Sequence, residues 1–391
     1  MIPVADALTA CLDLVDPLEI EEVALADAAG RVLARPVAAT RDQPPFASSA
    51  MDGYAVTEDD VIPGRSLRVI GEAAAGHVWR GTVTRGEAVR IFTGAPVPEG
   101  ATRVVIQEDV TRAGDRITLG DRLGDGANIR AAGGDFTIGQ TLPAPRRLRP
   151  ADIALAAAMN LPTLPVTRKP VVALIATGDE LVQPGEDPRA DQIIASNSYG
   201  LKAMVEAEGA EARLLPIARD TEDSLRAVLA LTDGADIIVT IGGASVGDHD
   251  LVGQVALGEG LERSFYKVAM RPGKPLMAGR MGDAALLGLP GNPVSSMVCA
   301  HVFLLPMIRA YLGLGKAAAP RRQAPVAVDM PENGPREHYM RARMGADGRV
   351  TPATRQDSAL LTVLSEADLL MVRPAGQGPL RAGSPVDILA L

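Results

Sequence analysis

One loop of this sequence combines accessible backbone amides with carboxylates, the two features that Mg²⁺-dependent chemistry on a phosphorylated substrate requires. Residues 237–241 have the character of a buried strand, and small residues follow them. Because no bulky side chain covers their N–H groups, we expect four of these to bind a phosphate, namely Gly242, Gly243, Ser245 and Gly247. Asp248 and Asp250 then place two acids at the rim. A strand-to-helix turn capped by an aspartate would show the same pattern.

Similar polar loops follow the other strand candidates between residues 170 and 315. Strand and helix candidates alternate there, which predicts a mostly parallel sheet with helices on its faces. In such a sheet, ligands bind in the loops at the carboxyl ends of the strands. Those loops offer acids for a metal ion and bases for a phosphate. The acids are Glu180, Asp220, Asp248 and Asp250, the bases are Lys267, Arg271 and Lys274, and the last loop contains Pro290, Asn292 and Pro293.

Each of these residues also has a purely structural explanation. An isolated aspartate after a strand, such as Asp179 or Asp220, commonly caps the following helix. The segments 272–275 and 290–293 combine Pro and Gly and could be rigid turns. We favour a functional interpretation because every strand end in this region carries polar, glycine-rich sequence. A structural domain has no reason to concentrate such residues on one edge of its sheet.

The composition argues against several classes of function. The 391 residues carry a net charge of −9, which argues against nucleic acid or an anionic membrane as the main partner. Only 3% of the residues are aromatic, too few for a platform that stacks single-stranded bases. The four histidines lack metal-binding spacing, so a histidine-based zinc site is not expected. The two cysteines, Cys11 and Cys299, lie in apolar surroundings and are predicted to be core residues.

We expect a cytoplasmic protein. The N-terminus has no basic region and carries Asp6, so it does not resemble a signal peptide. The most apolar stretch, residues 294–308, contains His301 and Pro306 and is expected to be too short to span a bilayer. We predict that it forms a buried core helix.

Four regions differ in sequence pattern, and together they predict an α/β plus β protein. Residues 1–45 and 146–169 form an elongated N-terminal region with helices at about 5–14 and 151–159, and the segment 161–170 reads as a linker stiffened by three prolines. Residues 46–145 form an inserted β-rich module. Residues 170–315 form the α/β domain, with strands at 171–176, 212–217, 236–241, 265–270 and 284–289 and helices at 197–208, 221–231 and 293–312. Residues 316–391 begin with a linker (316–325) and form a small β-barrel or sandwich whose first strand is 325–330.

Two loops of the β-rich module complete the candidate set. Asp52 lies in the segment PPFASSAMDGYAV (44–56), and Thr93 opens a turn after a short strand. Taken alone, each is an ordinary loop, and Asp52 reads as a turn or capping residue. Together with the segments that follow in the chain, however, they resemble the molybdopterin molybdenumtransferase family, to which the C-terminal part of gephyrin is related. The resemblance covers nearly the whole chain in order, through SSAMDGYAV, TGAPVPEGA, GANIRAAGGD, ATGDEL, GGASVGDHD, VAMRPGKP, GLPGNPVSS and QDSALLTVLSEADLL.

The resemblance implies the four-part architecture, with a molybdopterin-binding α/β domain, and a homodimer. The active site would lie between the α/β domain of one subunit and the β module of the other. The reaction would insert molybdenum from molybdate into adenylylated molybdopterin and release AMP with the help of Mg²⁺. Carried over by position, the metal and catalytic acids are Glu180, Asp220 and Asp250, the β-module residues are Asp52 and Thr93, and the basic residues are Lys267, Arg271, Lys274 and Arg341.

The chain also departs from the family pattern. Gly134 stands where the family often has an acid, QDSALL replaces a Gly-Ser-Gly-like turn, and Arg271 replaces a lysine. Three alternatives therefore stay open: a molybdopterin-binding scaffold without catalysis, a paralogue that handles another metal, and the enzyme of the preceding adenylylation step. The retained acids favour catalysis over a scaffold, and the β-module motifs argue against the adenylylating enzyme, which could instead be a partner. The sequence does not distinguish molybdate from tungstate.

Overall fold

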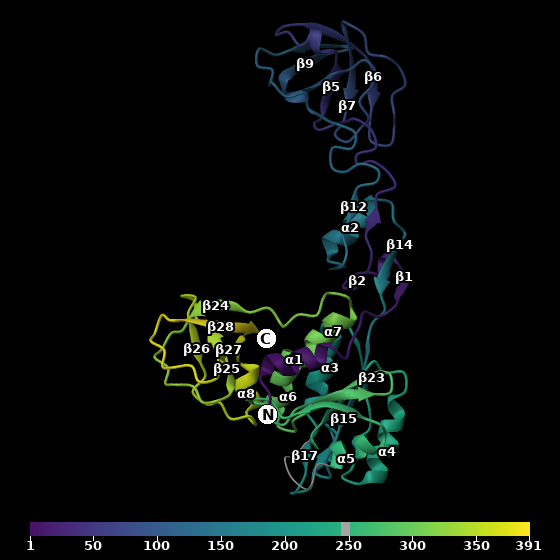
Figure 1. The fold of residues 1–391 in the computed structure, drawn as a ribbon. Coiled ribbons are helices and arrows are strands. Elements are labelled where there is room, and N and C mark those ends of the chain that lie inside the picture. Colours follow the sequence, from purple (N-terminus) through teal and green to yellow (C-terminus); the bar gives the residue numbers. More distant parts are fainter. Residues whose placement is uncertain (244–250) are drawn as a thin grey trace.

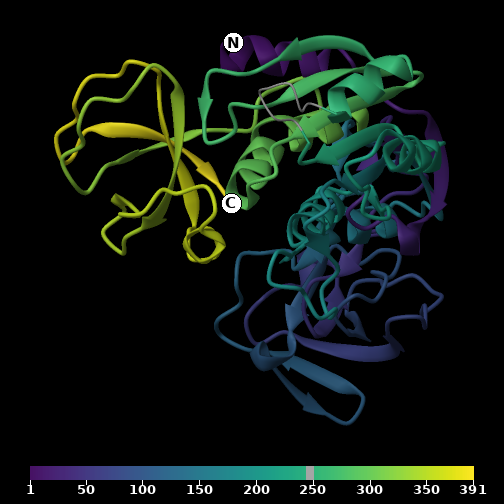
Figure 2. The ribbon, with the colours of Figure 1, turned by 90° about the horizontal axis from the view of Figure 1, so that it is seen from below.

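The computed structural model describes residues 1–243 and 251–391, so the predicted residues Ser245, Gly247, Asp248 and Asp250 lie outside the described part. The molecule is elongated (Figure 1): a β-rich module stands at one end of a narrow arm, and an α/β domain stands at the other. Seen from below in Figure 2, the C-terminal sheet lies beside the α/β domain. The order of these parts along the chain is the one that the sequence predicts.

The arm is built on a four-stranded sheet in the order β1 (Ile20–Ala24), β14 (Thr163–Thr167), β2 (Val32–Leu33) and β13 (Arg146–Arg147). A two-stranded ladder of β3 (Val37–Ala38) with β12 (Thr141–Leu142) and the helix α2 (Pro150–Ala158) complete it. The prediction of a linker at 161–170 was wrong, because β14 lies within it and pairs antiparallel with β1. Leu164 and Val166 are fully buried, and the carbonyl of Pro165 still accepts a hydrogen bond from Ala34, so proline is compatible with this strand.

The inserted module is a six-stranded sheet in the order β8 (Arg103–Ile106), β5 (Gly53–Val56), β7 (Glu87–Ile91), β6 (Ser66–Ala73), β10 (Arg116–Leu119) and β9 (Val110–Ala113). A short ladder of β4 (Ser48–Ser49) and β11 (Ile129–Arg130) joins it to the chain that enters and leaves. Tyr54 and Val56 pack into one core cluster while Ala55 packs into another. This alternation along β5 shows that both faces of the sheet are covered.

The α/β domain has a six-stranded sheet in the order β18 (Glu211–Leu214), β15 (Val171–Ala176), β19 (Ile237–Ile241), β23 (Ala284–Leu289), β22 (Met277–Met281) and β20 (Glu262–Tyr266). The first four strands are parallel and the last two pairings are antiparallel, which confirms a mostly parallel sheet. The helices are α1 (Val4–Leu12), α3 (Asn197–Ala207), α4 (Glu222–Leu229) and α5 (Leu251–Gly258), with α6 (Pro293–Cys299) and α7 (Leu305–Tyr311) joined by the π-helical turn η5 (Ala300–Leu304). The sequence analysis did not predict α5.

The strand predicted at 265–270 was wrong in its extent. β20 ends at Tyr266, and Lys267 follows with a positive φ of 76°. A separate strand, β21 (Met270–Arg271), leaves this sheet and pairs with the C-terminal one. Because β20 is antiparallel to β22, which is antiparallel to β23, its carboxyl end still lies at the same edge as that of β23.

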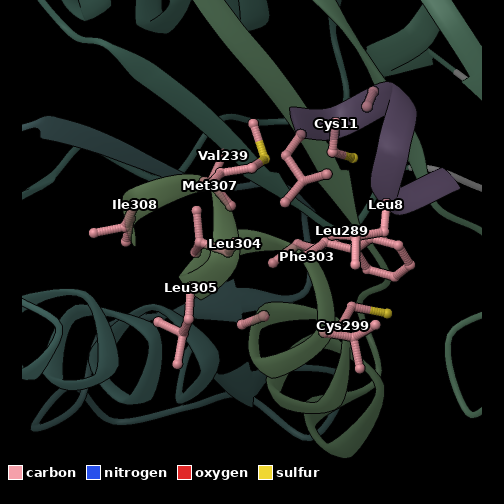
Figure 3. Close-up of a cluster of buried hydrophobic side chains, with 14 of the residues drawn as sticks. Leu8, Cys11, Val239, Leu289, Cys299, Phe303, Leu304, Leu305, Met307 and Ile308 are labelled. Atoms are coloured by element: carbon pink, nitrogen blue, oxygen red, sulfur yellow. The ribbon is translucent and has the colours of Figure 1, made fainter. Parts of the chain in front are cut away.

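The apolar segment near residue 300 forms the central core helix (Figure 3). The helix runs from Pro293 to Tyr311, 19 residues, so the expectation that it is too short to span a bilayer was wrong by length. It is the one candidate found among the described residues, and 83% of its apolar window is buried inside the protein. Phe303, Met307 and Leu8 of α1 belong to one buried cluster, and both cysteines are buried in the same cluster and unpaired, as predicted.

The C-terminal residues form a sheet in the order β21, β25 (Glu337–Met344), β27 (Leu369–Arg373), β28 (Pro385–Ala390) and β24 (Arg322–Pro325), with β26 (Val350–Pro352) beside β25. The short helix α8 (Leu361–Ser365) precedes β27. The boundary predicted between linker and first strand was wrong. β24 lies inside the predicted linker, whereas Val326 makes only an isolated bridge with Val350 and the chain bends at 327–328.

Candidate functional site

A large cavity lies at the carboxyl edge of the parallel strands. Its volume of about 950 Å³ is at the upper end of the range for small-molecule sites. The ends of β15 and β19, the loop after β23 and the starts of α3, α5 and α6 line it. The predicted residues that meet there are Glu180, Asp220, Gly242, Gly243, Pro290, Asn292 and Pro293.

The two glycines after β19 are required by the backbone. Gly242 and Gly243 have φ values of 93° and 67°, which other residues rarely adopt. A Cβ on Gly242 would lie 2.9 Å from the carbonyl oxygen of Thr177, and one on Gly243 would lie 2.2 Å from Val252. The N–H of Gly242 donates to Leu289, so this residue provides space and not a free donor. Within the described chain the N–H of Gly243 has no partner, and it is the amide that an anion in the cavity can reach.

Glu180 and Asp220 provide the carboxylates of the cavity. Glu180 follows β15 and Asp220 follows β18, and both side chains are exposed toward the open space. In the described part of the chain neither carboxylate accepts a hydrogen bond or an ion pair. Hard oxygen donors of this kind fit Mg²⁺. No cluster of three metal-binding side chains occurs among residues 1–243 and 251–391, and the third predicted ligand, Asp250, lies outside them.

The loop at 290–293 connects the cavity to the C-terminal sheet. Pro293 is the first residue of α6, which Asn292 precedes as the N-cap. The side-chain amide of Asn292 donates to the hydroxyl of Ser358 over 3.1 Å, and the N–H of Val294 donates to the carbonyl of the same serine over 3.0 Å. Ala359 also lines the cavity. The C-terminal part therefore forms one wall of the site.

Arg341, predicted to bind substrate, is fully buried in β25. Its Nη2 donates to the carbonyl of Asp357 over 2.8 Å, but Nε and Nη1 have no partner in the part of the chain that the structure describes. Burial lowers the pKa of this guanidinium, the positive charge of Arg271 adds to that lowering, and the carboxylate of Asp357 opposes it. Buried donors without acceptors are costly to the folded state, so an added acceptor would stabilise these two nitrogens.

The other predicted bases surround this region and do not line the cavity. Arg271 in β21 pairs with His338 of β25. Lys267 and Lys274 lie in the β20–β22 hairpin, where the N–H of Val268 donates to the carbonyl of Lys274. The adjacent Pro275 does line the cavity. Lys267 and Lys274 therefore lie on the hairpin and Arg271 on β21, close in the chain to the lining residue Pro275.

Asp52 and Thr93 meet in the β-rich module. The N–H and the hydroxyl of Thr93 both donate to Oδ1 of Asp52 over 2.7 Å. Arg90 stacks over the rings of Tyr54 and Phe92 and donates to the carbonyl of Gly53, beside Asp52. No described residue of 46–145 lines the cavity, and Figure 1 shows the module at the far end of the arm. One chain does not bring the two halves of the predicted site together.

Replacing Thr93 by valine will raise the pKa of Asp52 only part of the way to its usual value. The backbone N–H of Thr93 is the largest cause that holds this pKa low, the hydroxyl is the second, and valine removes only the hydroxyl. The hydrogen bonds from Thr93 to the Asp52 carboxylate therefore stabilise the folded protein at pH values above the ordinary pKa of an aspartate. This stabilisation is lost as the pH falls through the lowered pKa of Asp52. Carboxyl ¹³C NMR titration measures the shift, and Thr93→Ser is the control that should leave it unchanged. An unchanged pKa in Thr93→Val would contradict the assignment.

Three residues that the sequence analysis did not select lie near these groups. His338 is buried with an unpartnered Nε2, and burial followed by Arg271, Arg341, Arg373 and Arg336 lowers its pKa to about 4. Arg219 and Asp179 link the two loops that carry the acids. Asp179 was considered only as a helix cap, yet the next helix along the chain, α3, has Ser196 as its N-cap. In the sequence, the one sign of a role for Arg219 and Asp179 is that each directly precedes a predicted site acid, Asp220 and Glu180 respectively.

Comparison with known proteins finds family matches over three stretches of the chain. Residues 2–160 match the family described as "MoeA N-terminal region (domain I and II)". Residues 173–310 match a "Probable molybdopterin binding domain", and residues 323–391 match the "MoeA C-terminal region (domain IV)". A molybdopterin molybdenumtransferase of Nostoc is 35% identical over 99% of this chain and 93% of its own length. The chain belongs to the molybdopterin molybdenumtransferase family.

Other members of the family agree in sequence and in fold. The molybdopterin molybdenumtransferase of Bacillus subtilis is 32% identical over 100% of this chain and 94% of its own length. The crystal structure of the molybdopterin biosynthesis MoeA protein from Pyrococcus horikoshii superposes with a TM-score of 0.86 at 28% identity, covering 100% of both chains. The resemblance stated from the motifs is therefore confirmed, and with it the family's fold.

Proposed function

We propose that this protein is a molybdopterin molybdenumtransferase, which inserts molybdenum from molybdate into adenylylated molybdopterin and releases AMP. One observation carries the proposal. A cavity of about 950 Å³ has two carboxylates and a backbone amide without partners among the described residues, and it adjoins a wall that holds a buried arginine with two unpartnered nitrogens. A pterin nucleotide and an oxyanion together need such a pair of sites. The family membership of the whole chain supports the same reaction.

The pterin nucleotide would occupy the cavity. Its phosphates would accept from the N–H of Gly243, while Gly242 leaves room for them. Glu180 and Asp220, with Asp250 outside the described residues, would hold Mg²⁺, and the oxygen donors present fit that ion. When bound, Mg²⁺ would neutralise the negative charge that develops on the departing AMP phosphate. Asn292 and Pro293 would shape the wall toward the C-terminal sheet.

Molybdate would bind at the basic residues. Arg341 offers Nε and Nη1, two donors that lack an acceptor among the described residues and that would each donate to an oxygen of the oxyanion. Arg271, Lys267 and Lys274 would add positive charge on the cavity side. Asp357 and Gln356 hold Arg341 through its Nη2 and its backbone, so the guanidinium is oriented before the ligand arrives.

The working unit would be a homodimer in the cytoplasm. Asp52 and Thr93 stand far from the cavity of their own chain, so they can take part only if the arm reaches a partner's cavity. The four regions proposed from the sequence would act as domains, with the C-terminal sheet closing into a barrel-like form. The enzyme that adenylylates molybdopterin is the natural source of the substrate and a candidate partner.

AMP release tests this function directly. Purified protein is given adenylylated molybdopterin and Mg²⁺, with and without molybdate, and AMP and molybdenum cofactor are measured. We expect AMP release that depends on molybdate and on Mg²⁺. Binding of the pterin nucleotide without AMP release would instead identify a scaffold. Release that responds to another oxyanion, such as tungstate, and not to molybdate would identify a paralogue for another metal.

A further inference from the structure

The two loops that carry Glu180 and Asp220 are joined side by side. Thr177 forms a parallel bridge with Ala218, and the N–H of Gly178 donates to the carbonyl of Ala218 over 3.1 Å. These bonds end two residues before the acids. The hydrogen bonds that link the two loops nearer to the acids come from the side chains of Arg219 and Asp179.

Arg219, the neighbour of Asp220, reaches across to the loop of Glu180. Its Nη1 lies 3.3 Å from the carbonyl oxygen of Gly178, 3.1 Å from that of Asp179 and 3.0 Å from that of Leu181. These three carbonyls surround Glu180 in the chain. One guanidinium thus fixes the backbone on both sides of the first acid.

Asp179, the neighbour of Glu180, reaches across in the opposite direction. Its Oδ1 accepts a hydrogen bond from the backbone N–H of Asp220 over 3.1 Å. Gly178 matters as well, because its φ is 146° and a Cβ there would lie 2.4 Å from Oε2 of Glu180. The carboxylate of Glu180 therefore lies against the backbone that Arg219 holds.

We propose that Arg219 and Asp179 are positioning residues for the metal site, a reciprocal cross-link that sets the separation of Glu180 and Asp220. The inference rests on the proposed function, in which these two acids hold the metal ion. Two carboxylates facing one cavity repel each other before a cation binds. The cross-link opposes this repulsion, so that the cation does not have to order the loops when it binds.

Mn²⁺ binding, followed by electron paramagnetic resonance with Mn²⁺ alone as the probe, measures this effect without turnover. We expect Arg219→Met and Asp179→Ala to weaken Mn²⁺ binding about 10-fold, the lower end of the loss typical when a ligand's supporting residue is removed. Asp179→Asn keeps an oxygen that can accept from Asp220, so it should bind Mn²⁺ nearly as well as the wild type. Arg219→Lys keeps the charge and one donor group and should lie between Arg219→Met and the wild type.

Arg213→Met is the matched control. Arg213 also donates from its guanidinium to backbone carbonyls, those of Asp233 and Gly234, but at the other end of the sheet. The Arg213→Met protein should bind Mn²⁺ like the wild type, whereas the Glu180→Gln protein should lose Mn²⁺ binding. If Glu180→Gln loses Mn²⁺ binding while Arg219→Met and Asp179→Ala bind Mn²⁺ with wild-type affinity, the positioning role is wrong and the metal site is still supported. Wild-type binding in Glu180→Gln overturns the metal site itself. Equal losses in Asp179→Asn and Asp179→Ala would show that Asp179 acts through its charge and not by positioning.

Discussion

Mixing chains that carry Asp52→Asn with chains that carry Glu180→Gln will restore about one quarter of the wild-type activity if each active site combines two subunits. Each variant alone should lose activity about 100-fold or more, because each removes a carboxylate from every site. In a mixed dimer, one site receives both defective halves and the other receives both intact halves. Random exchange makes about half of the dimers mixed, which leaves a quarter of all sites intact.

The reason to expect this effect is the distance between the two halves. The Asp52–Thr93 pair lies in the module at the tip of the arm, and Glu180 lines the cavity of the α/β domain at its base. AMP release from the mixture, after unfolding and refolding together to exchange the subunits, is the measurement. Wild-type chains that carry two different affinity tags, mixed and refolded in the same way, show by co-purification that the subunits have exchanged. No recovery in the double mixture, with exchange demonstrated, would place both residues in a single-chain site or remove Asp52 from it.

The second large effect is expected at Arg341. Arg341→Met should lower the molybdate-dependent rate about 100-fold, since it removes the donors that face the oxyanion. At the same time its free energy of unfolding should stay level or rise, because a buried guanidinium with two unpartnered nitrogens is costly to the folded state. Binding of the pterin nucleotide should persist. The assays are AMP release against molybdate concentration and urea unfolding.

Arg373 provides the matched comparison. It is 2% exposed, yet its guanidinium donates to Gln377 and to the carbonyls of Pro331 and Gly378. Arg373→Met should therefore lower the free energy of unfolding by about 1–3 kcal/mol without changing the response to molybdate, because it leaves carbonyls unsatisfied. If Arg341→Met were destabilised like Arg373→Met and still responded to molybdate, Arg341 would be a structural arginine.

The parts of the site that depend on strand direction could be predicted from the sequence alone. Parallel strands end at a common edge, so Glu180, Asp220, Gly243 and Asn292 could be expected to meet once the alternating pattern of 170–315 was recognised. The motifs in order along the chain determined the family, which the comparisons confirmed.

Which polar groups remain available to bind a ligand depends on contacts that form only in the tertiary structure. Gly242 and Gly243 are equivalent in the sequence, but the N–H of Gly242 is occupied by Leu289, a partner 47 residues away along the chain. Arg341 and Arg373 are both buried arginines in neighbouring strands, and only their distant partners distinguish a satisfied side chain from one with two nitrogens that lack an acceptor among the described residues. Local periodicity reports which face of an element is buried, whereas hydrogen-bond satisfaction depends on residues that folding alone brings near. For the same reason, the sequence pattern of 161–170 did not reveal β14, because this strand forms by pairing with β1, which is distant in the chain.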